Sequence, residues 1–82
     1  MVYVEEARYL DGYRLWLRFN TGDTGEVDLS DLVAREPAAA PLCDPALFAA
    51  FFLDPWPTVA WACGFDVAPE ALFARAMGHA PR

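Results

Sequence analysis

The sequence of 82 residues contains no lysine, and its six basic residues are all arginine, against twelve aspartate and glutamate residues. The formal net charge is −6 and the isoelectric point is near 4.4. A strongly acidic chain is repelled by the phosphates of nucleic acids and by anionic membranes. We therefore expect no direct binding to nucleic acid or to a membrane. Charge of this sign favours solubility or a basic protein partner.

Residues for nucleophilic or metal chemistry are also scarce. The chain has one histidine, His79, and two cysteines, Cys43 and Cys63, which form neither a CxxC motif nor a metal-binding spacing. A serine or cysteine nucleophile would have to use His79 as its base, and no phosphate loop is present. The sequence thus predicts no catalytic residue, no metal site and no cofactor, and we expect a protein that is not an enzyme.

Long apolar runs and targeting segments are missing as well. No run approaches the roughly 18 residues of a membrane span, and the N-terminus lacks the basic and apolar regions of a signal peptide. We expect a cytoplasmic protein that keeps Cys43 and Cys63 as reduced, partly buried thiols, although the sequence leaves a disulfide open. The length predicts a single domain over residues 1–82, with an ordered core over about 2–78.

The apolar content is high for so short a chain, at 56% hydrophobic and 15% aromatic residues. A domain of this size buries only about 60% of the surface of its unfolded chain. Some apolar side chains are therefore expected at the surface, where a contiguous patch typically marks a partner or a homo-oligomer interface.

The first third of the sequence predicts three antiparallel strands. Residues 2–10 form the first, with Val4 on the face opposite Ala7 and Tyr9, and the acidic pair at 5–6 indicates a bulge or an edge position. Turns follow at 11–12 and 20–25, and a short third strand covers 26–29. The middle strand, residues 13–19, alternates between two faces. One face carries Tyr13, Leu15, Leu17 and Phe19, and the other carries Arg14, Trp16 and Arg18.

The remainder predicts helices and one more strand. Ser30 caps a short helix over 31–35, and residues 35–41 form an extended connector. Asp44 caps a helix that runs to about residue 52, with an apolar stripe of Leu47, Phe48, Phe51 and Phe52. Residues 58–63 form a strand, and a last helix runs from Pro69 to near Gly78. The fold class is α+β: a small two-layer domain with an antiparallel three-stranded meander plus a further strand, and helices packed on one face.

Two sets of residues are candidates for contact with a partner. Arg14, Trp16 and Arg18 place an aromatic ring between two guanidinium groups, and tryptophan and arginine are enriched in binding hot spots. The structural alternative is cross-strand packing with ion pairs to Glu5, Glu6, Glu26 or Asp28. Trp56, between two prolines, is the other candidate; it either contacts a partner or seals the end of the helix layer.

The junction at residues 61–73 suggests a different site. Trp61, Gly64 and Asp66 could border a small-ligand pocket, and Asp66 with Glu70 could form a carboxylate pair. Acidic residues and proline at a helix N-terminus already explain Asp66, Pro69 and Glu70 without any ligand.

The order of elements and three motifs resemble the bacterial family named domain of unknown function 2442. The motifs are Val27-Asp28-Leu29-Ser30-Asp31-Leu32-Val33, Leu42-Cys43-Asp44-Pro45-Ala46-Leu47-Phe48, and Trp61 through Leu72. Cys63 departs from the polar residue that the family usually has before Gly64. The resemblance covers about residues 3 to 73.

What this resemblance implies is limited, because the biochemical role of the family is poorly known. Some relatives carry the domain ahead of a helix-turn-helix domain, and others are encoded beside a second small protein, as toxin–antitoxin pairs are. The resemblance therefore implies a non-enzymatic protein-interaction or regulatory module, such as the antitoxin-like acidic partner of a small basic protein. The alternative that it implies is a small-ligand sensor domain of the kind fused to DNA-binding domains.

Overall fold

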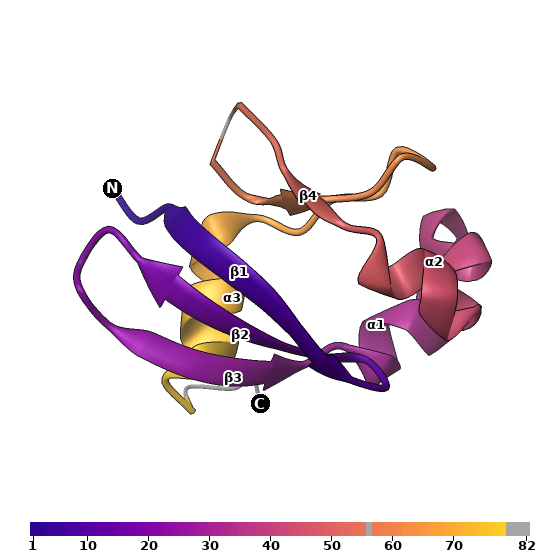
Figure 1. Cartoon of the computed structure of the whole chain (residues 1–82), viewed down its shortest axis with the longest axis horizontal. Coiled ribbons are helices and arrows are strands. Elements are labelled where there is room, and N and C mark those ends of the chain that lie inside the picture. Colours follow the sequence, from indigo (N-terminus) through magenta and orange to yellow (C-terminus); the bar gives the residue numbers. More distant parts are fainter. Residues whose placement is uncertain (56, 79–82) are drawn as a thin grey trace.

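The structure is a computed structural model that describes residues 1–55 and 57–78. Its order of elements confirms a small α+β domain (Figure 1). In chain order the elements are β1 (Val4–Asp11), β2 (Arg14–Phe19), β3 (Thr24–Asp28), α1 (Ser30–Arg35), the 3-10 helix η1 (Pro37–Cys43), α2 (Pro45–Ala49), β4 (Phe52–Leu53), β5 (Val59–Ala60) and α3 (Pro69–Ala76).

The three-stranded sheet is the predicted antiparallel meander, in the order β1-β2-β3. The alternation of β2 is confirmed, because Leu15, Leu17 and Phe19 are fully buried. The predicted bulge is present as a register shift between Val4 and Glu6. The shift changes which side chains share a face: the buried Val4 and the partly buried Ala7 both face the core. The expected face assignment of β1 was wrong because the extra residue in a bulge reverses the alternation.

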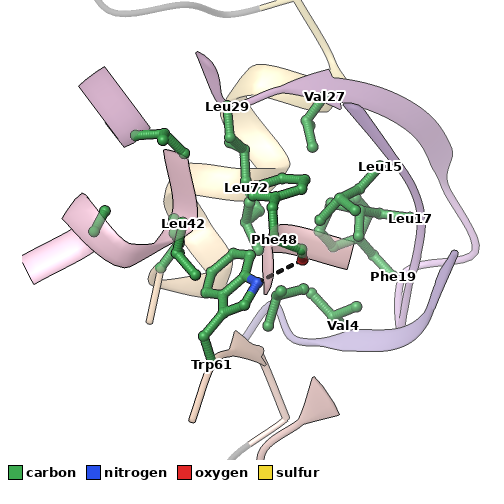
Figure 2. Close-up of a cluster of buried hydrophobic side chains, with 14 residues drawn as sticks. Val4, Leu15, Leu17, Phe19, Val27, Leu29, Leu42, Phe48, Trp61 and Leu72 are labelled. Atoms are coloured by element: carbon green, nitrogen blue, oxygen red, sulfur yellow. Dashed lines mark hydrogen bonds between the residues drawn. The ribbon is translucent and has the colours of Figure 1, made fainter. Parts of the chain in front are cut away.

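The core lies between one face of this sheet and the helices. Figure 1 shows α3 behind the sheet and α1 and α2 at one end. Phe48 from α2 and Leu72 from α3 are completely buried, and Figure 2 shows them among the inward side chains of β2. Phe73 packs edge-on against Phe19, with ring centroids 5.1 Å apart. Burial of these side chains supplies the main favourable free energy of folding.

The segment expected as an extended connector is instead the helix η1. Pro37 lies in its first turn, where a fixed φ near −65° suits a helix and no N–H is needed. Three alanines follow, and alanine has the highest helix propensity. The preceding helix also begins differently from the prediction. The Ser30 side chain does not cap α1. Instead, the Asp28 carboxylate accepts a hydrogen bond from the Ser30 N–H at 2.9 Å.

The next helix is shorter than expected. Asp44 is the predicted N-cap and accepts from the Ala46 N–H at 3.0 Å, but α2 ends at Ala49. Phe52 therefore leaves the helical stripe and is 46% exposed. It pairs with Ala60, so the further strand forms a separate two-stranded sheet, β4-β5, instead of joining the meander.

The last helix begins at Pro69 as predicted, and its C-terminal glycine, Gly78, has a φ of +77°. Cys43 and Cys63 are free thiols, but both are exposed rather than partly buried. Across the described residues, no helix has both the length and the apolar content that crossing a membrane would require.

Candidate interaction face

The outer face of the three-stranded sheet carries the arginine and tryptophan side chains of β2. Arg14, Trp16 and Arg18 alternate with the buried leucines of the same strand and so point away from the core. The described helices lie on the other side of the sheet or at its end (Figure 1). None of the described helices covers this outer face, and Arg14, Trp16 and Arg18 share it as the alternation of β2 predicted.

Each of the two arginines is held by carboxylates from a neighbouring strand or turn. Arg14 contacts Asp11 at 2.8 Å and Glu26 at 3.0 Å. Arg18 contacts Glu6 at 3.1 Å and Glu5 at 3.7 Å. Glu5, Glu6 and Glu26 are pairs of the structural alternative and Asp11 is an addition, whereas the Asp28 carboxylate accepts from the Ser30 N–H. Exposed pairs of this kind contribute up to about 1 kcal/mol each, so they position the guanidinium groups more than they stabilise the fold.

Arg8 also lies on this face, although it was not among the residues predicted from the sequence. Its guanidinium carbon lies 5.6 Å from the centroid of the Trp16 ring, and its Nε contacts Glu6 at 2.6 Å. Arg8 is the cross-strand partner of Trp16 in the sheet register. The acidic pair at residues 5–6 could have indicated this position, because a bulge there shifts the alternation of β1 and puts Arg8 on the outer face.

The outer face is ionised but not basic. Hydrogen bonds from Arg14 hold the pKa of Asp11 below its usual range, and Asp11 in turn raises the pKa of Arg14. Three arginines share the face with five carboxylates, namely Glu5, Glu6, Asp11, Glu26 and Asp28. The arrangement offers a partner one partly sheltered aromatic ring with fixed donors and acceptors around it, and the ion pairs can be exchanged on binding.

Trp61, Gly64 and Asp66 lie in three different environments. Trp61 is 3% exposed in the core, where its indole N–H donates to the Phe48 carbonyl at 2.7 Å (Figure 2). Gly64 sits in an exposed turn with a φ of +98°, a conformation that favours glycine. Asp66 is exposed, and its backbone forms a bridge to Ala60.

Two surface hollows lie beside this junction, and Asp66 borders both of them. The larger is about 720 Å³ and the smaller about 360 Å³. Glu70 borders only the larger, so the suggested carboxylate pair shares that hollow. Trp61 and Gly64 line neither hollow. Trp56, the other tryptophan expected to contact a partner, lies outside the described residues.

Comparison with known proteins gives one informative structure. No curated protein matches the chain. A solved structure from Nitrosomonas europaea ATCC 19718, named "Putative DNA Binding Protein NE0471", is 28% identical to the chain, with a TM-score of 0.78. The match covers 96% of this chain and 51% of the solved one, so this chain spans about half the length of that protein.

This similarity corrects one expectation. The net charge of −6 led us to exclude direct contact with nucleic acid, yet the similar structure carries a DNA-binding name. The exclusion was wrong because net charge is a sum over the whole surface. The net charge does not report where individual arginines lie on the surface. It also says nothing about the half of the similar protein that this chain does not match.

The family assignment rests on an independent comparison. The model of the family described as "Protein of unknown function (DUF2442)" matches residues 4–78, which is nearly the whole described chain. The match includes the three motifs on which the resemblance was based. The chain therefore belongs to the DUF2442 family.

Proposed function

We propose that this chain is a non-enzymatic interaction module of a DNA-associated protein or complex, and that the outer face of its three-stranded sheet is the contact surface. The observation that carries the proposal is the open position of Trp16, with Arg8 stacked on it and Arg14 and Arg18 fixed on either side. The DNA-binding name of the similar structure supports a DNA-associated context.

The chemistry of this face favours a protein that supplies both apolar and basic groups. An apolar side chain would pack on Trp16, and basic side chains would pair with the excess carboxylates. An antitoxin-like role is one form of this proposal: the acidic chain would occlude the basic, nucleic-acid-binding surface of its partner.

The test is capture of a binding partner by the tagged chain, with the Trp16→Ala variant alongside. The Arg35→Ala variant is the control, because Arg35 is an exposed arginine on α1 with only long ion-pair contacts of 3.8 Å. A stoichiometric partner that Trp16→Ala loses and Arg35→Ala keeps supports the proposal. A partner that both variants retain contradicts this choice of surface. Mobility-shift assays with the same three proteins test whether the face binds DNA itself.

Ligand sensing is a second proposal, favoured by the 720 Å³ hollow at the start of α3. Val67 and Pro69 line it with apolar surface, and Asp66 and Glu70 add two carboxylates. A ligand that raises the melting temperature of the wild type but not of Ala68→Trp, whose new ring would fill the hollow, supports this role. Equal shifts in both proteins place the ligand elsewhere.

A further inference from the structure

The exposed large apolar side chains come from a few segments of the chain. In the described part of the chain they come from the N-terminal segment, β1, α2 and β4, and β2, β3, α1 and α3 contribute none. The set is Met1, Tyr3, Tyr9, Leu10, Leu47, Phe52 and Leu53. Tyr9 packs against Phe48 of α2 at 6.3 Å, and β4 lies against β1. Figure 1 shows β1 at the edge of the sheet, next to β4.

Along this edge, the backbone of β1 carries hydrogen-bonding groups that no described residue engages. Tyr13 accepts from the Leu29 N–H and the Phe19 N–H donates to Asp23, so odd-numbered residues of β2 direct their backbone groups toward β3. In an antiparallel ladder the even-numbered residues must then direct theirs toward β1. Their partners Glu6 and Arg8 are thereby engaged. Ala7 and Tyr9 consequently direct their N–H and C=O groups outward.

We propose that β1 pairs with β1 of a second copy of this chain, antiparallel and about a two-fold axis at Ala7. The charges of the strand select this register. It places Glu6 of each copy opposite Arg8 of the other, which gives two favourable contacts. The next register that pairs outward-facing residues, Ala7 with Tyr9, brings the two Arg8 side chains together. A second copy is the occupant that fits, because a two-fold interface covers the same patch on both partners.

The pairing is short and has defined ends. The Pro57 carbonyl accepts from the Val4 N–H at 3.0 Å and so occupies the edge at the start of β1. A second register shift between Tyr9 and Asp11 interrupts the strand at its other end. Ala7 and Tyr9 lie in the stretch between these limits. Backbone bonds over so few residues need side-chain burial beside them, and the exposed side chains of Tyr9 on β1 and Phe52 on the neighbouring β4 are the ones we expect to supply it.

Such a dimer would extend the interaction face. Joining two β1 strands makes one continuous six-stranded sheet, whose outer surface carries both copies of Trp16. This consequence rests on the proposed function, whereas the pairing itself does not. A two-fold face would suit a partner or a DNA site that is itself symmetric.

Light scattering coupled to size exclusion tests the proposal with the full chain at about 100 µM, a concentration that reveals micromolar association. We expect a dimer for the wild type. Arg8→Glu and Glu6→Arg each put two like-charged pairs at the interface and should weaken dimerisation about tenfold. The double variant Glu6→Arg/Arg8→Glu restores both pairs and should return the dissociation constant to within about threefold of wild type.

Two controls separate the interface from general charge effects. Arg35→Glu and Glu36→Arg make the same changes of net charge at the end of α1, outside β1, and should leave the dimer intact. Circular dichroism checks that every variant is folded. A monomeric wild type overturns the proposal. So does a dimer that tolerates the single variants, or one that the double variant fails to restore. If the wild type is monomeric and a different protein binds along the β1 edge, that protein is the occupant of the edge and the proposed dimer is wrong.

Discussion

At the scale of single residues, Trp61 is the clearest example of a side chain whose polar group is needed inside the core. Its N–H reaches the Phe48 carbonyl at 2.7 Å in a buried environment. Trp61→Phe leaves that carbonyl without its donor and a void where the larger ring was, which should cost about 2–4 kcal/mol. Thermal unfolding should show a fall of at least about 8 °C for a domain of this size.

Trp16→Phe is the matched control for this prediction, because it makes the same replacement on the outer face of the sheet. It loses part of a cation–π contact that is worth about 0.5–1 kcal/mol at an exposed site. A loss in Trp61→Phe no larger than in Trp16→Phe would mean that the Phe48 carbonyl has found another donor.

The ion pair between α1 and α3 predicts a dependence of stability on pH. Arg75 donates to both carboxylate oxygens of Asp31, at 2.9 and 2.7 Å, and thereby lowers the pKa of Asp31 below its ordinary value of 3.8. A lowered folded-state pKa stabilises the fold above the unfolded pKa and loses that contribution as the pH falls through the folded value. Asp31→Asn should therefore lower the melting temperature at pH 7 and make little difference near pH 2.

Asp23→Asn is the comparison for this pH experiment, since Asp23 accepts a hydrogen bond from the Thr21 hydroxyl instead of from an arginine. Because half of the Asp31 side chain is exposed, the effect at pH 7 should be at most about 1 kcal/mol. A difference between wild type and Asp31→Asn that persists unchanged at pH 2 would show that the ion pair is not its source.

At the scale of elements, the sequence predicted those parts that local pattern alone determines. The alternation in β2 and the Asp44-Pro45 start of α2 are confirmed, because a period of two and a helix cap are recognisable without any partner. The end of α2 was wrong because spacings of three and four place Phe51 and Phe52 on a stripe whether or not the helix continues. The helix ends where Phe52 pairs instead with Ala60 in the short β4–β5 hairpin, a contact that the apolar spacing of α2 does not reveal.

The candidate face shows the same limit. Arg14, Trp16 and Arg18 were found from alternation within one strand, whereas Arg8 and Asp11 depend on how β1 is registered against β2. That register depends on the bulge between Val4 and Glu6, which moves the later residues of β1 to the opposite face. Trp61 was interpreted from its motif alone, and the burial that makes it part of the core comes from α2, thirteen residues earlier.

The contact between β3 and α3 gives a prediction at this scale. A Cβ atom at Gly25 would come within 2.8 Å of the Ala76 carbonyl oxygen, so the helix can approach the strand only because residue 25 is glycine. Gly25→Ala should push the end of α3 away and cost about 1–3 kcal/mol in chemical denaturation. Thr24→Ala, on the same strand and exposed, should change stability by less than about 0.5 kcal/mol. Equal losses would argue that strand propensity matters more than the close approach.

At the scale of the whole molecule, the charge of −6 predicts how association with the proposed basic protein partner would depend on salt. Long-range attraction is screened beyond about 10 Å at 0.1 M salt and beyond about 3 Å at 1 M. The association rate constant should therefore fall by about tenfold or more between low and high salt, while the dissociation rate, which in the proposed complex depends on packing against Trp16, should change little. Stopped-flow or surface-binding kinetics measure both rate constants.

The Trp16→Ala variant should show the converse behaviour. Its dissociation should be faster and the salt dependence of its association unchanged, because the substitution removes contact area but no charge. Salt-independent association of the wild type would mean that the acidic surface serves solubility, and that the contact rests on the aromatic ring and its neighbours alone.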